Sequence, residues 1–171
     1  MAISAKRVKK LIEKNSELNL SDAEVSFKVK TLALTTSGTL TQADAGITVL
    51  LDSAASPYIV TLPSTSSLQT GWNCSVITAG ALAKHVYVAK NGGVSETTEF
   101  KGFVFNMTTT GDDPEAAKAT FFNPADHFIK IDGGKDSIGD RMDLTWNGTH
   151  FMVNAWCSGS TAITGSDTAL A

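Results

Sequence analysis

The chain has 171 residues, of which 42% are hydrophobic and 18% charged, and its formal net charge is −3. A chain of this length forms one domain with a sizeable core, and its ordinary apolar content excludes global disorder. Apolar stretches such as residues 47–51 are far shorter than the ~20 residues of a membrane-spanning helix. No apolar signal segment follows the basic N-terminus, so we expect a protein made in the cytoplasm.

Residues 1–24 are predicted to form a basic N-terminal arm. Residues 1–30 carry seven Lys or Arg against four Asp or Glu, whereas the rest of the chain is net acidic. Residues 4–18 predict a short amphipathic helix, because apolar side chains recur on one face at helical spacing. A helix this short needs a surface to bury its apolar side, so we expect it to dock on a partner. The predicted docking residues are Lys6, Arg7, Val8, Lys9, Lys10, Leu11, Ile12 and Lys14.

Residues 25–157 are predicted to form a β-rich body. Apolar and polar residues alternate with a period of two from Val25 onward, as in a half-buried strand. Turn signals recur every 8–12 residues, which is typical of an antiparallel β-sandwich or a jelly-roll-like barrel, so the expected fold class is all-β. The predicted strands are residues 25–29, 31–35, 46–51, 58–62, 73–78, 85–89, 99–107, 119–122, 128–131, 142–146 and 151–156.

The last two predicted strands form the clearest local motif, in the sequence MDLTWNGTHFMVNAW. Asn147-Gly148 is a pair typical of a type I′ hairpin turn, and Trp146 and Phe151 flank it. Residues 158–171, which follow the hairpin, are small and polar. We expect them to form a tail that is flexible or that contacts a neighbouring subunit.

The reactive side chains form no familiar catalytic or metal-binding motif. His85, His127 and His150 are far apart in the sequence, and no H-E-x-x-H or C-x-x-C pattern accompanies them. Cys74 and Cys157 lie in apolar runs, which favours two reduced, buried thiols over a single disulfide. We therefore expect a protein that is not an enzyme and that binds no cofactor and no metal.

One acid-rich segment is a candidate calcium loop. Four aspartates share the Gly-rich residues 132–143: Asp132, Asp136, Asp140 and Asp143. A calcium ion takes several carboxylates on a turn, but the segment lacks the D-x-[DN]-x-[DN]-G spacing. Lys135 and Arg141 lie between the acids and could neutralise them, so the sequence favours a solvated loop.

The basic arm has three conceivable partners: nucleic acid, a membrane surface or another protein. The first aromatic residue, Phe27, lies outside the predicted helix, and the body is acidic, which disfavours nucleic acid. The apolar stripe also lacks the Trp or Phe of a membrane-surface helix. A protein is the predicted partner of the arm.

Two segments resemble a module found in structural proteins of tailed bacteriophages. The first, LTQADAGITVLLDSAASPYIVTLPSTSSLQTGWNCSVI, has a Thr-rich lead, an Ala-Asp-x-Gly turn, a strand ending in Thr-Leu-Pro and the pair Gly71-Trp72. The second, GDRMDLTWNGTHFMVNAWCSG, resembles the closing hairpin of the same module. Together they cover roughly a third of the chain.

The resemblance implies a virion component on the outer capsid surface, made in the host cytoplasm. It implies a capsid decoration (cement) protein or a head fibre that binds the major capsid protein and is usually a homotrimer. A compact body without repeats favours these over a long tail fibre. The alternative is a receptor- or carbohydrate-binding fibre tip, in which Trp72, Trp146 or Trp156 stacks on a host-surface glycan, although tryptophans at strand positions favour a core role.

Overall fold

The computed structural model describes residues 30–91, 100–106, 118–122, 126–136, 138–159 and 162–166. Within these ranges the protein is β-rich, as predicted, with strands in two mixed sheets and two short 3-10 helices, η1 (Gln42–Asp44) and η2 (Thr65–Ser67). The predicted arm and the predicted strand at 25–29 lie outside the described residues. No helix in the described part of the chain is long and apolar enough to cross a membrane.

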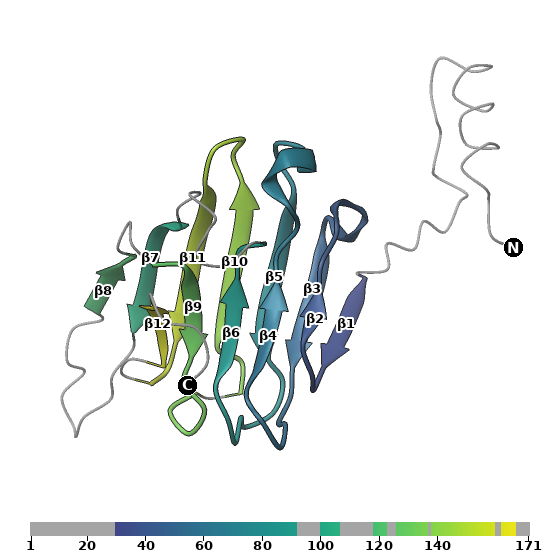
Figure 1. Ribbon diagram of the computed structural model, residues 1–171. Helices are drawn as coiled ribbons and strands as arrows, with labels where there is room; N and C mark the ends of the chain where they lie inside the picture. Colours follow the sequence, from purple (N-terminus) through teal and green to yellow (C-terminus); the bar gives the residue numbers. More distant parts are fainter. Residues whose placement is uncertain are drawn as a thin grey trace, which may run out of the picture.

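One sheet has seven strands and the other has five (Figure 1). The seven-stranded sheet runs, in spatial order, β1 (Thr31–Leu34), β3 (Ile47–Leu51), β5 (Asn73–Thr78), β10 (Arg141–Trp146), β11 (Phe151–Cys157), β7 (Phe100–Asn106) and β8 (Lys118–Phe121). The five-stranded sheet runs β12 (Ile163–Ser166), β9 (Phe128–Ile131), β6 (Val86–Ala89), β4 (Tyr58–Thr61) and β2 (Gly38–Thr39).

The first six strands alternate between the two sheets. Strands β1, β3 and β5 are parallel neighbours in the larger sheet, and β2, β4 and β6 are parallel neighbours in the smaller one. The prediction of purely antiparallel sheets is therefore wrong. Side-chain alternation along a strand determines which face is buried, but it carries no information on the direction of the neighbouring strand.

The later strands restore antiparallel pairing. Strand β10 pairs antiparallel with both β5 and β11, and β9 does so with both β6 and β12. Strand β7 lies parallel to β11, and β8 pairs antiparallel with β7 at the end of the larger sheet. The sheets are consequently mixed rather than uniform.

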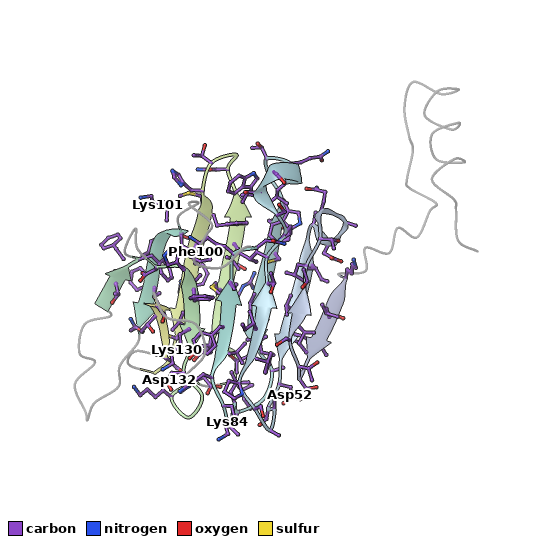
Figure 2. All side chains as sticks on the ribbon, viewed as in Figure 1. Asp52, Lys84, Phe100, Lys101, Lys130 and Asp132 are labelled. Atoms are coloured by element: carbon purple, nitrogen blue, oxygen red, sulfur yellow. The ribbon has the colours of Figure 1, made fainter. Side chains whose placement is uncertain are left out.

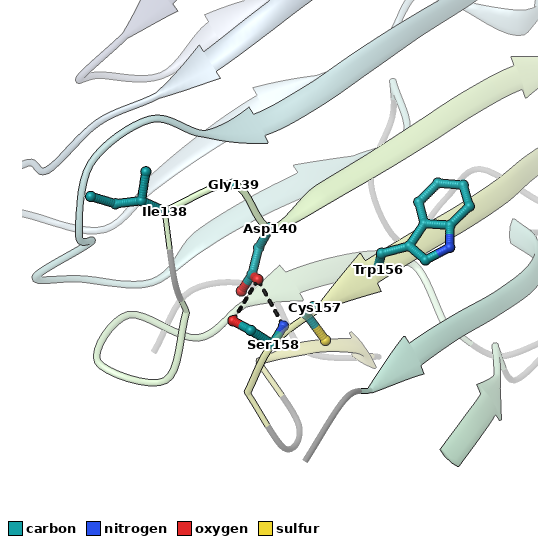
Figure 3. Close-up of a pocket in the computed structure, with 6 residues that line it drawn as sticks. All are labelled: Ile138, Gly139, Asp140, Trp156, Cys157 and Ser158. Atoms are coloured by element: carbon teal, nitrogen blue, oxygen red, sulfur yellow. Dashed lines mark hydrogen bonds between the residues drawn. The ribbon is translucent and has the colours of Figure 1, made fainter. Parts of the chain in front are cut away.

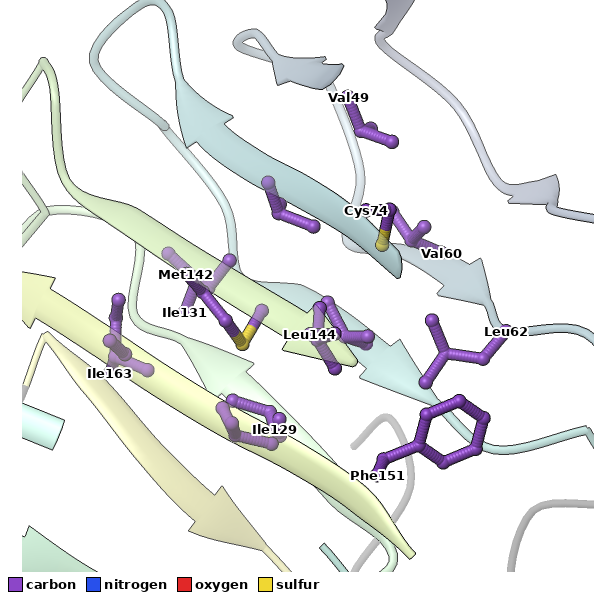
Figure 4. Packing of buried hydrophobic residues seen from close by; sticks show 14 of the residues in the cluster. Val49, Val60, Leu62, Cys74, Ile129, Ile131, Met142, Leu144, Phe151 and Ile163 are labelled. Carbon is purple, nitrogen blue, oxygen red and sulfur yellow. The ribbon is translucent and has the colours of Figure 1, made fainter. Parts of the chain in front are cut away.

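Both sheets contribute to one hydrophobic core (Figure 4). Val49 of β3 and Leu144 of β10 point inward from the larger sheet, Val60 of β4 and Ile129 of β9 point inward from the smaller one, and all four are fully buried. Burying such a side chain contributes roughly 1.5–3 kcal/mol. This shared cluster joins the two sheets.

The predicted hairpin is confirmed, but its loop is longer than the predicted type I′ turn. Trp146 pairs with Phe151, which leaves a four-residue loop instead of two residues. The Asn147 carboxamide oxygen accepts hydrogen bonds from the backbone N–H groups of Thr149 and His150, at 2.9 and 2.7 Å. This side-chain oxygen replaces the backbone acceptor of a tight turn.

Part of the segment predicted to be a tail forms a strand. Strand β12 pairs with β9 along its whole length, and Ile163 lies opposite Ile131. Ile163 is 2% exposed and belongs to the core. The small residues of this segment hid the strand from sequence analysis, because they give little apolar alternation.

Candidate functional site

The predicted docking residues lie outside the described part of the chain, so the candidate site is built from the body. The structure does define the two segments that carry the resemblance. Strand β5, in the first segment, pairs with β10, in the second, and Cys74 lies opposite Leu144. The two segments therefore form one connected unit.

The Ala-Asp-x-Gly turn of the first segment is closed by the carboxylate of Asp44. Its Oδ2 accepts hydrogen bonds from the Thr41 backbone N–H and hydroxyl, both at 2.8 Å, and Lys30 donates to its Oδ1. These bonds lower the pKa of Asp44 from 3.8 to about 2, and the bond from Lys30 makes the largest contribution to this shift. Gly46 then adopts a φ of 76°, which a residue with a side chain rarely adopts. The motif therefore builds a rigid entry to β3.

The Gly71-Trp72 pair ties the same turn to the hairpin. The Trp72 indole N–H donates to the Thr41 carbonyl at 3.1 Å, and the Gly71 N–H donates to the Trp146 carbonyl at 2.8 Å. Trp72 is 2% exposed and its ring meets Phe151 edge-on, with centroids 6.3 Å apart. This tryptophan is a core residue and is not available to a ligand.

Two of the three tryptophan side chains are buried, and the third is accessible to solvent. Trp146, like Trp72, is buried, at 4% exposure, whereas Trp156 is 43% exposed. The expectation that tryptophans at strand positions belong to the core is confirmed for the first two. Trp156 points to the outer face of the seven-stranded sheet, the face away from the core, because its neighbours Ala155 and Cys157 point inward and are buried.

Trp156 belongs to a larger group on this outer face, which we call the aromatic patch. It comprises the side chains of Phe103, Phe105, Phe121 and Trp156. Trp156 lies opposite Phe105 across the β11–β7 pair, and Phe121 lies opposite Phe103 across the β7–β8 pair. The rings of Phe103 and Phe105 are edge-to-face, with centroids 5.4 Å apart. Phe121 is the most exposed of the four, at 76%.

The aromatic patch was not predicted, although the sequence contains a signal for it. Phe103, Val104 and Phe105 place apolar side chains on both faces of one strand, and only Val104 points into the core. A strand that is apolar on both faces is typical of a sheet covered on both sides. In the described part of the chain, nothing covers the outer face at the most exposed patch residues.

A bonded polar cluster borders the patch. Asp143 of β10 accepts hydrogen bonds from the Ser75 hydroxyl at 2.6 Å and from the Arg141 guanidinium at 2.9 Å. Arg141 also donates to the Ser75 hydroxyl oxygen at 3.2 Å. The charges of this cluster are thus matched within the chain.

A shallow hollow of about 250 Å³ opens beside Trp156 (Figure 3). Ile138, which is 71% exposed, and Trp156 form its apolar rim, while Asp140 and Ser158 lie at its base. The Asp140 carboxylate accepts hydrogen bonds from the Ser158 N–H at 2.8 Å and from its hydroxyl at 3.0 Å. The polar groups at the base bond each other, so the hollow presents mainly its apolar rim.

The aspartates of the candidate calcium loop accept separate local hydrogen bonds instead. The Asp136 carboxylate accepts a hydrogen bond from the Leu82 N–H at 3.2 Å, and Asp140 and Asp143 are engaged as described above. Over the described ranges, no group of three or more His, Cys, Asp or Glu side chains gathers as a metal site would require. Asp136 and Asp140 therefore stabilise loops, and Asp143 links β10 to β5.

Asp132 lies in a polar cluster at the end of the smaller sheet near Lys84 (Figure 2). Its carboxylate lies 3.1 Å from His85 Nδ1, 3.3 Å from Lys130 Nζ and 3.5 Å from Lys135 Nζ. Burial opposes ionisation of this carboxyl, but the Lys130 hydrogen bond and the surrounding charges hold the pKa of Asp132 below its usual value. The cluster fastens the turn after β9 to the start of β6.

In the described part of the chain, the histidines and cysteines do not gather into one site. The Nδ1 atoms of His127 and His150 are buried without a hydrogen-bond partner in the described structure. Cys74 and Cys157 are both free and buried, as predicted. Cys157 Sγ donates to the Asn106 carboxamide oxygen at 2.8 Å, so it joins β11 to β7.

Comparison with known proteins leaves the family open. No protein-family model matches the chain, and no curated protein matches its sequence. The resemblance to phage structural proteins therefore stays a prediction, and the aromatic patch is the candidate functional site that the structure itself provides.

Proposed function

We propose that this chain is a non-enzymatic structural protein of a tailed-phage virion, a capsid decoration protein or a head-fibre subunit on the outer shell. The observation that carries the proposal is the pairing of β5 with β10. Two segments that resemble one phage module, and that are far apart in the sequence, fold into one unit. If the two segments resembled the module only by chance, there would be no reason for them to be neighbours in the fold.

The roles of the motif residues support the same proposal. Asp44 closes a turn, Trp72 links that turn to the core, and Asn147 closes the hairpin. Each residue that carries the resemblance serves rigidity. A protein that reinforces a shell needs a stiff body and an attachment, and it needs no reacting group.

The body fits a two-layer β-sandwich, and the arm supplies its attachment to the shell. In this proposal Val8, Leu11 and Ile12 bury their apolar stripe in a groove of the major capsid protein, while Lys6, Arg7, Lys9, Lys10 and Lys14 face acidic shell residues. A homotrimer would present three arms at once, and multivalency would then multiply a weak single contact.

The test is deletion of residues 1–20 followed by binding to capsids that lack this protein. We expect occupancy to fall at least tenfold, and we expect wild-type binding to weaken with salt because the arm is basic. Deletion of residues 167–171 is the matched control, with circular dichroism to confirm that each body is folded. Undiminished occupancy after removal of the arm would refute the proposal.

For the alternative function, a receptor- or carbohydrate-binding tip, Trp156 is the tryptophan that is accessible to a ligand. Trp72 and Trp146 are buried, and Trp156 is 43% exposed beside a hollow. A glycan array on wild-type protein and on Trp156→Ala tests this alternative. Binding that disappears in a folded Trp156→Ala variant would favour it.

A further inference from the structure

The aromatic patch carries a projecting ring, and the hollow beside it has room for a ring. Phe121 projects from β8, the strand at the end of the seven-stranded sheet, and is 76% exposed. The hollow beside Trp156 has a volume of about 250 Å³, and a cavity of roughly 150 Å³ already accommodates a benzene molecule. One chain thus carries both a projecting ring and a recess of a size to receive one.

We infer that the aromatic patch is a contact surface between copies of this chain, in which Phe121 of one copy enters the hollow between Ile138 and Trp156 of the next. The inference rests on the proposed function in one respect, the expectation of a homo-oligomer. It adds the surface and the residues that form the contact. A contact between two different patches of identical subunits is heterologous; such contacts form a ring where the rotation between subunits closes and an open filament where it does not.

The amount of apolar surface supports an interface. Single exposed apolar side chains are common, but contiguous patches mark interaction sites. Phe121, Trp156 and Ile138 are between 43% and 76% exposed. At the usual size of such side chains they leave on the order of 400 Å² in water, about half of the ~800 Å² that each partner of a standard interface buries.

The side-chain chemistry favours protein over sugar as the occupant. Three of the four patch residues are phenylalanines, which have no polar group to orient a hydroxyl-rich ligand. The neighbouring polar groups of Ser75, Arg141 and Asp143 already bond one another. Aromatic residues with few charges are instead the composition of a protein–protein interface core.

The distribution of charge disfavours an anionic partner and suits contact with a second copy. A surface that meets a copy of itself must not repel its own charge. Arg141 and Asp143, the ionic pair beside the patch, cancel each other at 2.9 Å, and the four patch residues are neutral. A nucleic acid or an acidic shell would gain nothing from such a surface, because it offers no cluster of cations.

The test is the mass of the full-length protein in solution, measured by light scattering over a range of concentrations. We expect wild type to be a multiple of the 18.0 kDa chain and Phe121→Asp to fall to the single-chain mass. Thr120→Asp is the matched control. It adds the same charge at the adjacent exposed position on the other face of β8, and it should keep the wild-type mass.

A mixing experiment tests the pairing itself. Ile138→Arg should block the hollow and also give single chains. A one-to-one mixture of Phe121→Asp and Ile138→Arg should form a complex of two chains, because the intact ring of one variant meets the intact hollow of the other. Failure of this mixture to associate would overturn the proposed pairing.

Two further outcomes would overturn the inference while leaving the virion role to the arm-deletion test. One is a wild-type protein that is a single chain at all concentrations. The other is glycan binding that requires Trp156, with no dependence of mass on Phe121. Loss of capsid binding on arm deletion, with an unchanged mass, would show that the two surfaces act separately.

Discussion

Leu144 lies directly opposite Cys74 across the antiparallel β10–β5 pair. Both side chains point into the core, at 0% and 3% exposure. The pair joins the strands of the early, parallel half to those of the late, antiparallel half. A substitution at this pair therefore acts where the two halves of the chain meet in the core.

Leu144→Ala should destabilise the protein by about 2–5 kcal/mol, because it removes a buried side chain and leaves a cavity where both sheets meet. The neighbouring Thr145 is exposed, so Thr145→Ala should stay within about 0.5 kcal/mol of wild type. Urea unfolding followed by fluorescence measures both. A Leu144→Ala protein as stable as the control would show that the junction is not part of the core.

Gly102→Ala should destabilise the larger sheet severely. A Cβ at this position would lie 1.8 Å from the Val153 carbonyl oxygen, and the φ of Gly102 is 141°. Gly134 also has a positive φ, 91°, but a Cβ there meets nothing within 4 Å. We expect a cost of about 1 kcal/mol for Gly134→Ala from strain and of at least about 3 kcal/mol for Gly102→Ala from strain and collision. Thermal unfolding of the two variants separates these contributions, and equal costs would refute the close approach of β7 to β11.

Asp44 should make stability depend on acid pH. Its pKa is about 2 in the folded protein and 3.8 for the unperturbed group, so the folded state favours the carboxylate. This contribution is fully present above pH 3.8 and is lost as pH falls through about 2. We expect the unfolding free energy of wild type to exceed that of Asp44→Asn by about 1 kcal/mol at pH 5, after allowance for the exposed Lys30, and most of the difference to be lost by pH 2.

Lys30→Met provides the control for the origin of this effect, because Lys30 is the main cause of the lowered pKa. The difference in unfolding free energy between Lys30→Met and wild type should also shrink as the pH falls from 5 to 2. Urea unfolding at pH 5, 4, 3 and 2 gives both curves. A difference for Asp44→Asn that is constant over these values would contradict the lowered pKa.

The two thiols should be inert in the native protein. Burial, and secondarily the negative charge of Asp143, raise the pKa of Cys74 to about 12. Burial raises the pKa of Cys157 to about 11, although the backbone N–H of Ile163 works against it. Thiolates are the reactive form, so iodoacetamide at pH 8 should label neither residue until denaturant is added. Asn154→Cys, at an exposed position of β11, should react at once, whereas rapid labelling of native wild type would contradict the burial.

The sequence predicted the strands better than their arrangement. In β10 the residues Met142, Leu144 and Trp146 alternate with polar ones, and all three are buried as their spacing requires. Strand β2 has only Gly38 and Thr39, too few residues to show a period. Strand direction was mispredicted because it depends on how the chain crosses between sheets, which no local pattern records.

The candidate site was harder to predict for a related reason. Trp72 and Trp156 both occur in strand-like sequence, yet one is buried and the other is 43% exposed. The difference depends on which face of the sheet the core covers. Phe121 was unremarkable in the sequence, and only the place of β8 at the end of the sheet makes it prominent.

The alternation of the first six strands between two sheets has a consequence for how such a protein can change its length. Each successive pair of strands completes one coil of a flattened solenoid, stacked on the coil before it. A solenoid grows by whole coils, since each coil contacts only its neighbours. Insertion or loss of one coil would lengthen or shorten the body while the closing hairpin stays intact, so bodies of different height can arise from the same plan.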